Sequence, residues 1–290
     1  MDLGNASPAF VRRSSLAQLN RRVRVKEILD GVCRDVTKQN IRLDFAYDGT
    51  DFHGFQRQPG LRTVQGTLEE AIGKLSGEDV SLLGAGRTDA GVHAKAQVGN
   101  FATSSRIPLE RWPLALNSRL PHDLVVIKAA QVPAQFHARR SALAKTYRYT
   151  LQVAPYPDVF WSRFAWHIAQ PLDIHAMRAG AAHLVGTWDF TSFCSAKTEI
   201  ENKVRTLFSF HIWQEEERIT LEVEGNGFLY NMVRIMVGTL VEVGLGKRGA
   251  NEVREMLSVR RRTAAGMTAP PQGLVLWRIK YPALDDGQML

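Results

Sequence analysis

From residue 41 onwards, the order of strand-like and helix-like segments is the feature that most restricts the fold. Strand segments repeat their apolar residues every second position, whereas amphipathic helices repeat them every three or four. By these periods the first series contains strands over 41–52 and 124–133, helices over 63–77 and 108–120, and two extended runs around a glycine-rich loop within 80–103. The predicted order is β-α-β-β-α-β, with Gly77 ending the first helix.

A similar series follows residue 140. It contains strands over 144–155, 218–228 and 273–282, and helices over 173–186, 229–244 and 251–262. In the middle strand Ile219, Leu221 and Val223 alternate with polar residues, which is typical of an antiparallel sheet with one buried face. The helix over 229–244 carries an apolar stripe made of Leu229, Val233, Met236, Val237 and Leu240. The sequence therefore predicts an α+β fold with two halves, residues 39–140 and 141–284, whose antiparallel sheets flank a central cleft.

The composition is that of an ordinary globular chain, with 290 residues of which 44% are hydrophobic and 23% are charged. The two cysteines, Cys33 and Cys194, are far apart and lack a CxxC spacing, so neither a disulfide framework nor a thiolate metal site is predicted. No apolar run has the roughly 18 residues that a membrane helix needs, and the first residues lack the apolar core of a secretory signal. We therefore expect a soluble intracellular protein without a membrane partner.

The chain is basic, with 37 Lys and Arg against 29 Asp and Glu and a pI near 9.7. This excess suits a polyanion such as nucleic acid, although many soluble proteins are equally basic without such a partner. Residues 1–38 hold eight basic and four acidic residues. We interpret 1–38 as a loosely ordered basic extension and 285–290 as a tail. An RNA-contacting arm and a misassigned start codon are alternatives for the extension, and its acidic residues argue against a transit peptide.

The stretch GAGRTDAGVHA, residues 84–94, has the glycine content of a phosphate-binding loop. A dinucleotide fingerprint needs a third glycine where this chain has Asp89, and a carboxylate would repel a pyrophosphate. A P-loop needs a Lys-Ser/Thr pair that does not follow here. The loop instead places Arg87 close to Asp89, and we expect this arginine to lower the pKa of the carboxyl group and keep it ionised. An aspartate that only caps the turn is the alternative.

Arg234 interrupts the apolar helix segment MVRIMVGTLV, where a charge needs either a partner or a face toward solvent. The pattern leaves both alternatives open.

The eight histidines form no HxxxH or HExxH pair, so no metal site is predicted. His93, within the glycine-rich loop, is interpreted as a structural hydrogen-bonding residue.

Seven motifs follow one another along the chain: YDGTDFHGFQRQ at 47–58, GRTDAGVHA at 86–94, FHARRSA at 136–142, KTYRY at 145–149, DFTSF at 189–193, GNGFLYNMVRIMVG at 225–238 and TAPPQGL at 268–274. In this order they resemble the motifs of the TruA-type tRNA pseudouridine synthases. The resemblance covers about residues 40–282 and implies the pseudouridine synthase fold, in which the two halves derive from ferredoxin-like units.

The resemblance also implies an activity. It implies a homodimeric isomerase, without cofactor or metal, that converts uridine to pseudouridine in the tRNA anticodon stem-loop, at tRNA positions 38, 39 and 40. We expect this activity in the cytoplasm. Two alternatives come from other classes: a tRNA-binding protein without catalysis, and a small-molecule enzyme with an aspartate nucleophile.

The resemblance assigns site residues by their positions in the motifs. Asp89 matches the catalytic aspartate, Tyr147 the aromatic residue that stacks on the target uracil, and Arg234 the arginine beside the catalytic carboxylate. Leu274 matches a hydrophobic residue of the uracil pocket. Arg87 is assigned either to the phosphate of the flipped nucleotide or to the catalytic carboxylate. For Tyr147 and Leu274, a core position in a strand is the alternative.

A uridine inside an A-form stem must be extruded before it reaches an active site, which costs a few kcal/mol that other contacts must offset. Candidates for backbone phosphate contacts are Arg139, Arg140, Lys145, Arg260, Arg261 and Arg262. Each has the alternative of an ordinary solvated charge. Arg140 departs from the family pattern, which often has an aromatic residue at this position, and its role stays open.

Overall fold

The computed structural model describes residues 38–282. The described residues from Gln39 onwards form one compact unit, and the description concerns this unit alone. The extension predicted for 1–38 lies outside the described residues except for Lys38, and the tail predicted for 285–290 lies outside them entirely. Both therefore stay predictions, as does the division of the remaining chain at residue 140.

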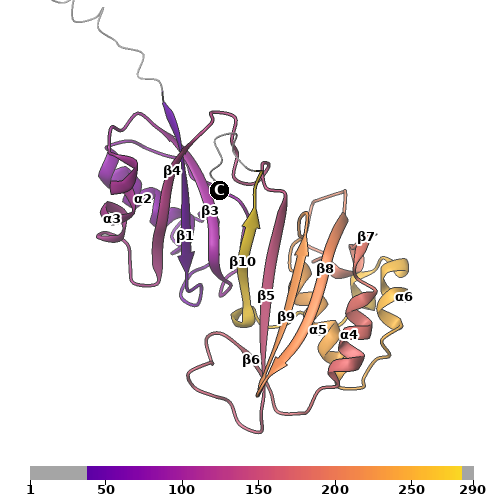
Figure 1. Cartoon of the computed structure of the whole chain (residues 1–290). Coiled ribbons are helices and arrows are strands. Elements are labelled where there is room, and N and C mark those ends of the chain that lie inside the picture. The colour runs from indigo at the N-terminus through magenta and orange to yellow at the C-terminus, as the bar shows by residue number, and fades with distance from the viewer. Residues whose placement is uncertain (1–37, 283–290) are drawn as a thin grey trace, which may run out of the picture. The chain divides into compact units, whose positions relative to one another are not determined.

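The strands of the first series build one side of a ten-stranded sheet (Figure 1). They are β1 (Gln39–Tyr47), β2 (Leu83–Gly84), β3 (His93–Thr103) and β4 (Leu124–Val132). Strand β1 pairs antiparallel with both β3 and β4. The first of the two extended runs predicted within 80–103 is reduced to the two residues of β2, because the glycine-rich loop begins at once.

The strands of the second series continue the same sheet. They are β5 (Ala144–Val153), β6 (Trp166–Ile168), β7 (Gly186–Asp189), β8 (Val204–Glu215), β9 (Arg218–Gly225) and β10 (Leu274–Lys280). Sequence analysis did not predict β6, β7 or the 12-residue β8. The sheet order is β4-β1-β3-β10-β5-β9-β8-β7, with β2 beside β3 and β6 beside β5.

Strand β10 joins the two series. It pairs parallel with β3, where Val275 faces His93, and antiparallel with β5, where Leu276 faces Tyr147. Figure 1 shows β10 lying between these strands. The α+β fold predicted from the sequence is confirmed, but the two predicted sheets are the halves of one continuous sheet, because β10 closes the gap between them.

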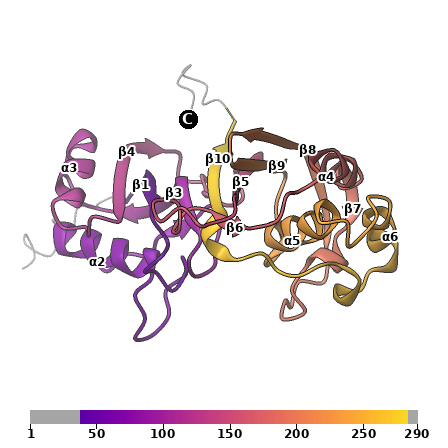
Figure 2. The same cartoon turned by 90° about the horizontal axis from the view of Figure 1, so that it is seen from below.

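The helices are α2 (Val64–Ser76), α3 (Trp112–Asn117), α4 (Ile174–Ala182), α5 (Met232–Gly244) and α6 (Glu252–Val259). The predicted ends of α2 are confirmed: Thr63 Oγ1 accepts a hydrogen bond from the Gly66 amide, and Gly77 has φ 74°. Figure 2 shows α2 and α5 on the same side of the sheet. These helices cover the face whose β9 residues Ile219, Leu221 and Val223 are buried, as the alternation predicts.

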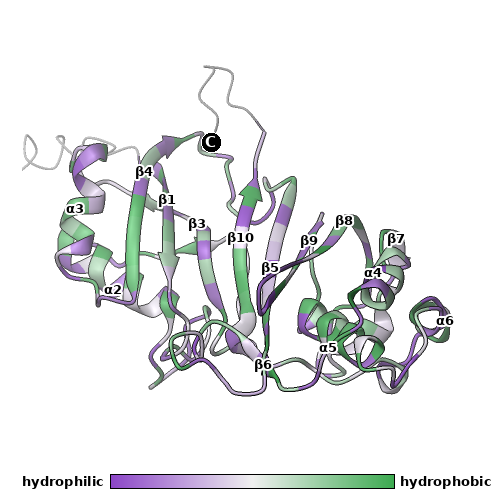
Figure 3. Cartoon of the chain, turned by 60° about the horizontal axis from the view of Figure 1, so that its bottom comes forward, coloured by the Kyte–Doolittle hydropathy of each residue, from purple (hydrophilic) through white to green (hydrophobic). Residues whose placement is uncertain are grey.

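Helix α5 is more deeply buried than its predicted stripe suggests. Eleven of its 13 residues are buried, and only Arg234 and Glu242 are not. Figure 3 shows this helix as largely hydrophobic. A helix that is apolar all round belongs in a core. Its one arginine is therefore held inside the protein.

The opposite face of the sheet is polar and carries paired charges. Arg148 Nε donates to Glu222 at 2.6 Å, and the Arg148 guanidinium lies 3.8 Å from the centroid of the Trp277 ring. Lys95 Nζ lies 3.9 Å from the same centroid. No helix of the described residues is long and apolar enough to span a bilayer.

Candidate active site

The cavity that collects the predicted site residues has a volume of about 710 Å³. Seven of the residues singled out in the sequence line it, namely Arg87, Asp89, Arg139, Lys145, Tyr147, Arg234 and Leu274. Its walls come from the β1–α2 loop, the glycine-rich loop, the start of β5, residues 197–200 and residues 228–234. Segments far apart in sequence thus meet at one hollow, whose volume is in the range of ligand sites.

The glycine-rich loop presents Asp89 through a tight turn. The amide of Val92 donates to the carbonyl oxygen of Asp89 at 3.1 Å, and Gly91 has φ 78°. This positive φ is strained for any residue with a Cβ, and a Cβ here would also lie 2.9 Å from Pro271. Gly91 therefore fixes how the chain turns back into β3 and where the carboxylate lies.

Asp89 forms an ion pair with Arg234 at the N-terminal end of α5. Arg234 Nη1 donates to Asp89 Oδ2 at 3.1 Å, and the two side chains are 15% and 25% exposed. The guanidinium is held by two further bonds, from Nε to the Ala269 carbonyl at 2.8 Å and from Nη1 to Asn231 Oδ1 at 3.1 Å. Of the two alternatives for Arg234, the solvent-facing one is wrong, because three protein groups accept its hydrogen bonds.

The pKa of Asp89 departs from the sequence expectation. Burial raises the pKa of this carboxyl group, and the Arg234 guanidinium only opposes that rise. The expectation that Arg87 lowers it is wrong, because Arg87 is exposed at the cavity wall, and Arg234, 145 positions along the chain, makes the contact instead. Burial is the larger effect because removing a carboxylate from water disfavours its charged form.

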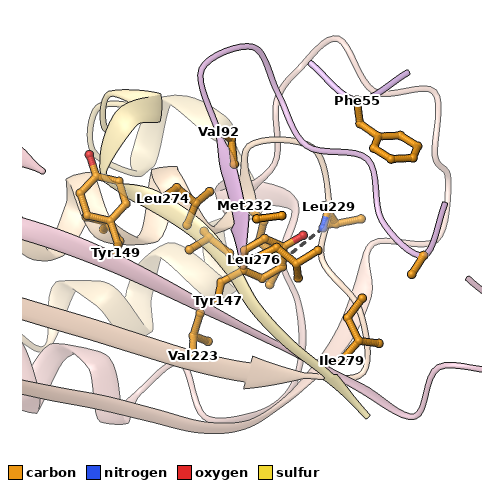
Figure 4. Packing of buried hydrophobic residues seen from close by; sticks show 14 of the residues in the cluster. Phe55, Val92, Tyr147, Tyr149, Val223, Leu229, Met232, Leu274, Leu276 and Ile279 are labelled. Carbon is orange, nitrogen blue, oxygen red and sulfur yellow. Dashed lines mark hydrogen bonds between the residues drawn. The ribbon is translucent and has the colours of Figure 1, made fainter. Parts of the chain in front are cut away.

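Tyr147 lines the cavity and is 7% exposed. Its ring meets Phe228 edge to face, with centroids 5.0 Å apart and planes at 81°. In the sheet it is flanked by Leu276 and Val223, and Figure 4 shows it among these residues and Leu229 and Met232. Tyr147 is thus both part of the apolar sheet face and part of the cavity wall. A core position in the strand is therefore compatible with the predicted contact with the uracil.

Leu274 and Tyr149 continue this surface. Leu274 is buried, faces Tyr149 across the β10–β5 pair and contributes to the cavity wall. Tyr149 lies deeper, and its hydroxyl donates to the Pro270 carbonyl at 2.8 Å. Burial raises the pKa of both Tyr147 and Tyr149. Both phenols therefore stay neutral through the physiological range.

Three polar residues that sequence analysis did not single out hold the glycine-rich loop. The Tyr47 hydroxyl and Thr88 Oγ1 are 2.8 Å apart, and Gln97 Nε2 donates to the Gly86 carbonyl at 2.9 Å. Burial raises the pKa of Tyr47 to about 12. Tyr47 and Thr88 lie inside two of the quoted motifs, so the signal was present, but only the fold brings them together.

His93 joins two segments, as interpreted from the sequence. Its Nδ1 accepts from the Gly49 amide at 3.0 Å, so Nε2 carries the proton and donates to the Gln272 carbonyl at 3.0 Å. Burial lowers the pKa of His93, which keeps the ring neutral. The described residues hold no group of three or more His, Cys, Asp or Glu side chains suited to a metal ion.

The remaining basic candidates lie outside the cavity lining. Arg140 is exposed in the turn before β5. Arg260, at the C-terminal end of α6, lies 3.4 Å from Asp189, and Arg262 donates to the Ala265 carbonyl and to Thr268 Oγ1. Arg261 is exposed, and its backbone amide donates to Ser192 Oγ. Part of this arginine run therefore has bonds within the protein, and its contact with RNA stays a prediction.

Comparison with known proteins shows the family. The model of the family described as tRNA pseudouridine synthase matches residues 45–139 and 181–282. This chain belongs to that family. The tRNA pseudouridine synthase family was the one predicted from the seven motifs, so that prediction is confirmed.

Individual members of the family match over nearly their whole length. The tRNA pseudouridine synthase A of Halalkalibacterium halodurans is 51% identical over 83% of this chain and 92% of its own. The enzyme of Brevibacillus brevis is 50% identical over 84% of this chain and 100% of its own. The enzyme of Bacillus subtilis is 47% identical over 83% of this chain and 98% of its own. Among solved structures, the archaeal box H/ACA sRNP Nop10–Cbf5 complex matches 69% of this chain and 44% of its own at 10% identity and a TM-score of 0.32, which supports no comparison of the two folds.

Proposed function

We propose that this protein is a tRNA pseudouridine synthase that isomerises uridine in the anticodon stem-loop, at tRNA positions 38, 39 and 40. The observation that carries the proposal is the Asp89–Arg234 pair, which lies in the same cavity as Tyr147. The names of the curated relatives support the activity and the tRNA substrate. The specific tRNA positions come from the motif resemblance.

The reaction needs a carboxylate and a uracil base that stays bound in the site. The glycosidic bond between C1′ and N1 breaks, the uracil turns within the site, and C1′ bonds to C5. The proton lost from C5 is balanced by one gained at N1, so no oxidant, reductant or water is consumed. Arg234 binds Asp89 Oδ2, and no hydrogen bond within the described residues occupies Oδ1, so one carboxylate oxygen stays available to the nucleotide.

Asp89 is proposed as the catalytic residue. Adding to the sugar, adding to the ring and removing a sugar proton all require its ionised form. Arg234 favours that form and fixes its orientation, while burial makes the ionised oxygen more reactive than it would be in water. Tyr147 is proposed to stack on the uracil, with Leu274 beside it, which contributes about 1–3 kcal/mol toward extrusion of the base.

Arg87 and the basic surface are proposed to bind the RNA backbone. Arg87 is exposed at the cavity wall, so a phosphate of the flipped nucleotide is its proposed partner. Arg139, Arg140, Lys145 and the run from Arg260 to Arg262 are proposed to contact other phosphates. Their contacts offset the cost of extrusion and make binding salt-dependent.

We further propose a cytoplasmic homodimer. The family resemblance supports the dimer, and so does the exposed apolar segment between β5 and β6, where Tyr156, Val159 and Phe160 are 83%, 75% and 87% exposed. The tRNA substrate supports the compartment. Light scattering of the purified full chain tests the dimer, because a monomer mass at micromolar concentration would contradict it.

The activity is tested by tritium release from C5-labelled uridine in an unmodified tRNA transcript, without added metal or cofactor. The wild-type chain is expected to release tritium, and Asp89→Asn to release none while still binding the transcript. Release by the variant would contradict the role of Asp89. Binding without release by either chain would favour a non-catalytic tRNA-binding protein.

A further inference from the structure

We infer that Arg139, Lys145 and Arg205 form a subsite for one phosphodiester of the RNA strand that carries the target uridine. These three residues are called the basic cluster. The inference rests on the proposed function and deepens it, because it assigns one phosphate to one set of side chains. Arg205 is a new member, since no motif contains it.

The topology brings the basic cluster together at one end of the sheet. Strands β5 and β8 both pair antiparallel with β9, so they run in the same direction and begin at the same end. Lys145 is the second residue of β5, and Arg205 is the second residue of β8. Arg139 lies in the turn that leads into β5. Arg205 and Lys145 lie two positions before the buried Leu207 and Tyr147 in their strands, which places both on the helix-covered face.

No carboxylate of the described residues neutralises the basic cluster. Across the sheet Lys145 faces Gly225 on β9 and Ile279 on β10, so neither neighbouring strand places an acid beside it. Arg205 Nη1 donates only to backbone carbonyls, those of Asn202 and Val204. The cations repel one another: Arg139 and Arg205 both lower the pKa of Lys145, and Arg139 lowers the pKa of Arg205.

The basic cluster lowers the stability of the folded protein unless an anion binds to it. Burial and the charges of Arg139 and Arg205 lower the pKa of Lys145 to about 8, and burial with the charge of Arg139 lowers the pKa of Arg205. Arg139 is exposed, but Lys145 and Arg205 are partly buried, and like charges gathered there are unfavourable in the free protein. A phosphate offers the missing negative charge and several acceptor oxygens at once, so binding it relieves this cost.

The position of the ammonium group ties the subsite to the target nucleotide. A Cβ placed on Gly86 would lie 3.9 Å from Lys145 Nζ and 3.6 Å from the Tyr147 hydroxyl. The ammonium group and the proposed stacking residue therefore lie beside the same point of the glycine-rich loop. A phosphate bound there belongs to a nucleotide next to the target, because Arg87 is proposed to bind the phosphate of the target nucleotide itself.

The other charged groups around the cavity do not alter this assignment. Those that line it are His53, Arg87, Asp89, Lys197, Glu199 and Arg234. The carboxylate of Asp89 is engaged by Arg234. The pKa of Lys145 is about 8, so the charge of Lys145 changes between pH 7 and 9.

The test measures binding of an anticodon stem-loop RNA in which one phosphodiester at a time is replaced by an uncharged methylphosphonate. All proteins carry Asp89→Asn, so the RNA is not converted during the measurement. In the otherwise unchanged chain, neutralising one phosphate next to the target uridine is expected to weaken binding about tenfold. Lys145→Gln is expected to weaken binding of the unmodified RNA by a similar factor and to lower the salt slope by about one.

The decisive result is the combination of the two changes. If Lys145 binds that phosphate, Lys145→Gln with the methylphosphonate is expected to lose about tenfold in total, because the second change removes nothing more. Losses that multiply to about a hundredfold at every position would overturn the inference. Arg205→Gln is expected to behave like Lys145→Gln, and the exposed Lys247→Gln, beyond the C-terminal end of α5, serves as the matched control.

A pH series separates a charged contact from a misfolded variant. Affinity of the otherwise unchanged chain is expected to fall as pH rises from 7 to 9, because the lysine loses its proton, whereas Lys145→Arg is expected to keep its affinity. Titration of the RNA is common to both chains and cancels. Equal pH dependence of the two would overturn the inference. Wild-type tritium release is measured alongside, so that an absence of activity, which would refute the proposed function, is distinguished from failure of this subsite.

Discussion

The Asp89–Arg234 pair and the basic cluster carry charge in opposite ways. Asp89 and Arg234 pair at 3.1 Å, and the arginine has two further acceptors. The described part of the chain supplies no carboxylate to the basic cluster. Asp89, Arg234, Lys145 and Arg205 are all partly buried and Arg139 is exposed, so the difference does not come from burial alone.

This difference indicates which role each group has in the reaction. A paired carboxylate is oriented before substrate arrives and needs no counterion from it. An unneutralised group of cations is incomplete until an anion binds, and its unfavourable energy in the free protein is recovered on binding. The first arrangement suits a chemical step and the second suits holding an RNA strand.

Breaking the Asp89–Arg234 ion pair is expected to have the largest effect. Arg234→Gln leaves Asp89 buried without its cation, so the pKa of this carboxyl group, already raised by burial, is expected to rise further. Activity needs the ionised form and is lost as pH falls through this pKa. The acid limb of the kcat profile is therefore expected to move about 1–3 pH units upward, with kcat at pH 7 about a hundredfold lower.

The matched control for Arg234 is Arg254→Gln, which removes an exposed arginine from α6. Tritium release is measured from pH 5 to 9 for both variants. An acid limb of Arg234→Gln that coincides with that of the wild type would show that the ion pair does not govern the ionisation of Asp89.

Changing Tyr147 is expected to give an intermediate effect. Removing the ring in Tyr147→Ala is expected to weaken binding of the stem-loop about tenfold or more, because a stacked base loses about 1–3 kcal/mol. Tyr147→Phe keeps the ring and its edge-to-face contact with Phe228, so its affinity is expected to stay within about threefold of the wild type. Equal losses in both variants, measured by fluorescence anisotropy, would refute stacking as the main contribution.

The smallest effect is expected for the stability of the folded protein when Lys145 of the basic cluster is changed. The folded-state pKa of Lys145, about 8, lies below its ordinary value of 10.5, so its ionised form costs stability below pH 8, and this cost disappears as pH rises toward 10.5. Lys145→Met is therefore expected to raise Tm at pH 7 by about 2–4 °C, with a smaller gain at pH 9.5. Thermal denaturation at both pH values checks this, and a lower Tm at pH 7 would show that the ammonium group stabilises the free protein.

Local patterns predicted many of the elements because their causes are local. The ends of α2 follow from Thr63 and Gly77, and the face of β9 follows from the alternation of Ile219, Leu221 and Val223. Strand β8 was missed although it holds 12 residues, and β2 was overestimated. The single sheet was not foreseen, because the parallel pairing of β10 with β3 joins residues about 180 positions apart.

By itself the sequence determined the family, the α+β class and the residues with which to search for a site, because motifs and periodicity depend on residue identity and spacing. Only the tertiary structure decided which arginine pairs with Asp89, that burial raises the pKa of this carboxyl group, and that Arg205 joins Lys145 at the start of two parallel-running strands. These features depend on distance and on exclusion of water. Neither quantity exists until segments distant in the chain have packed together.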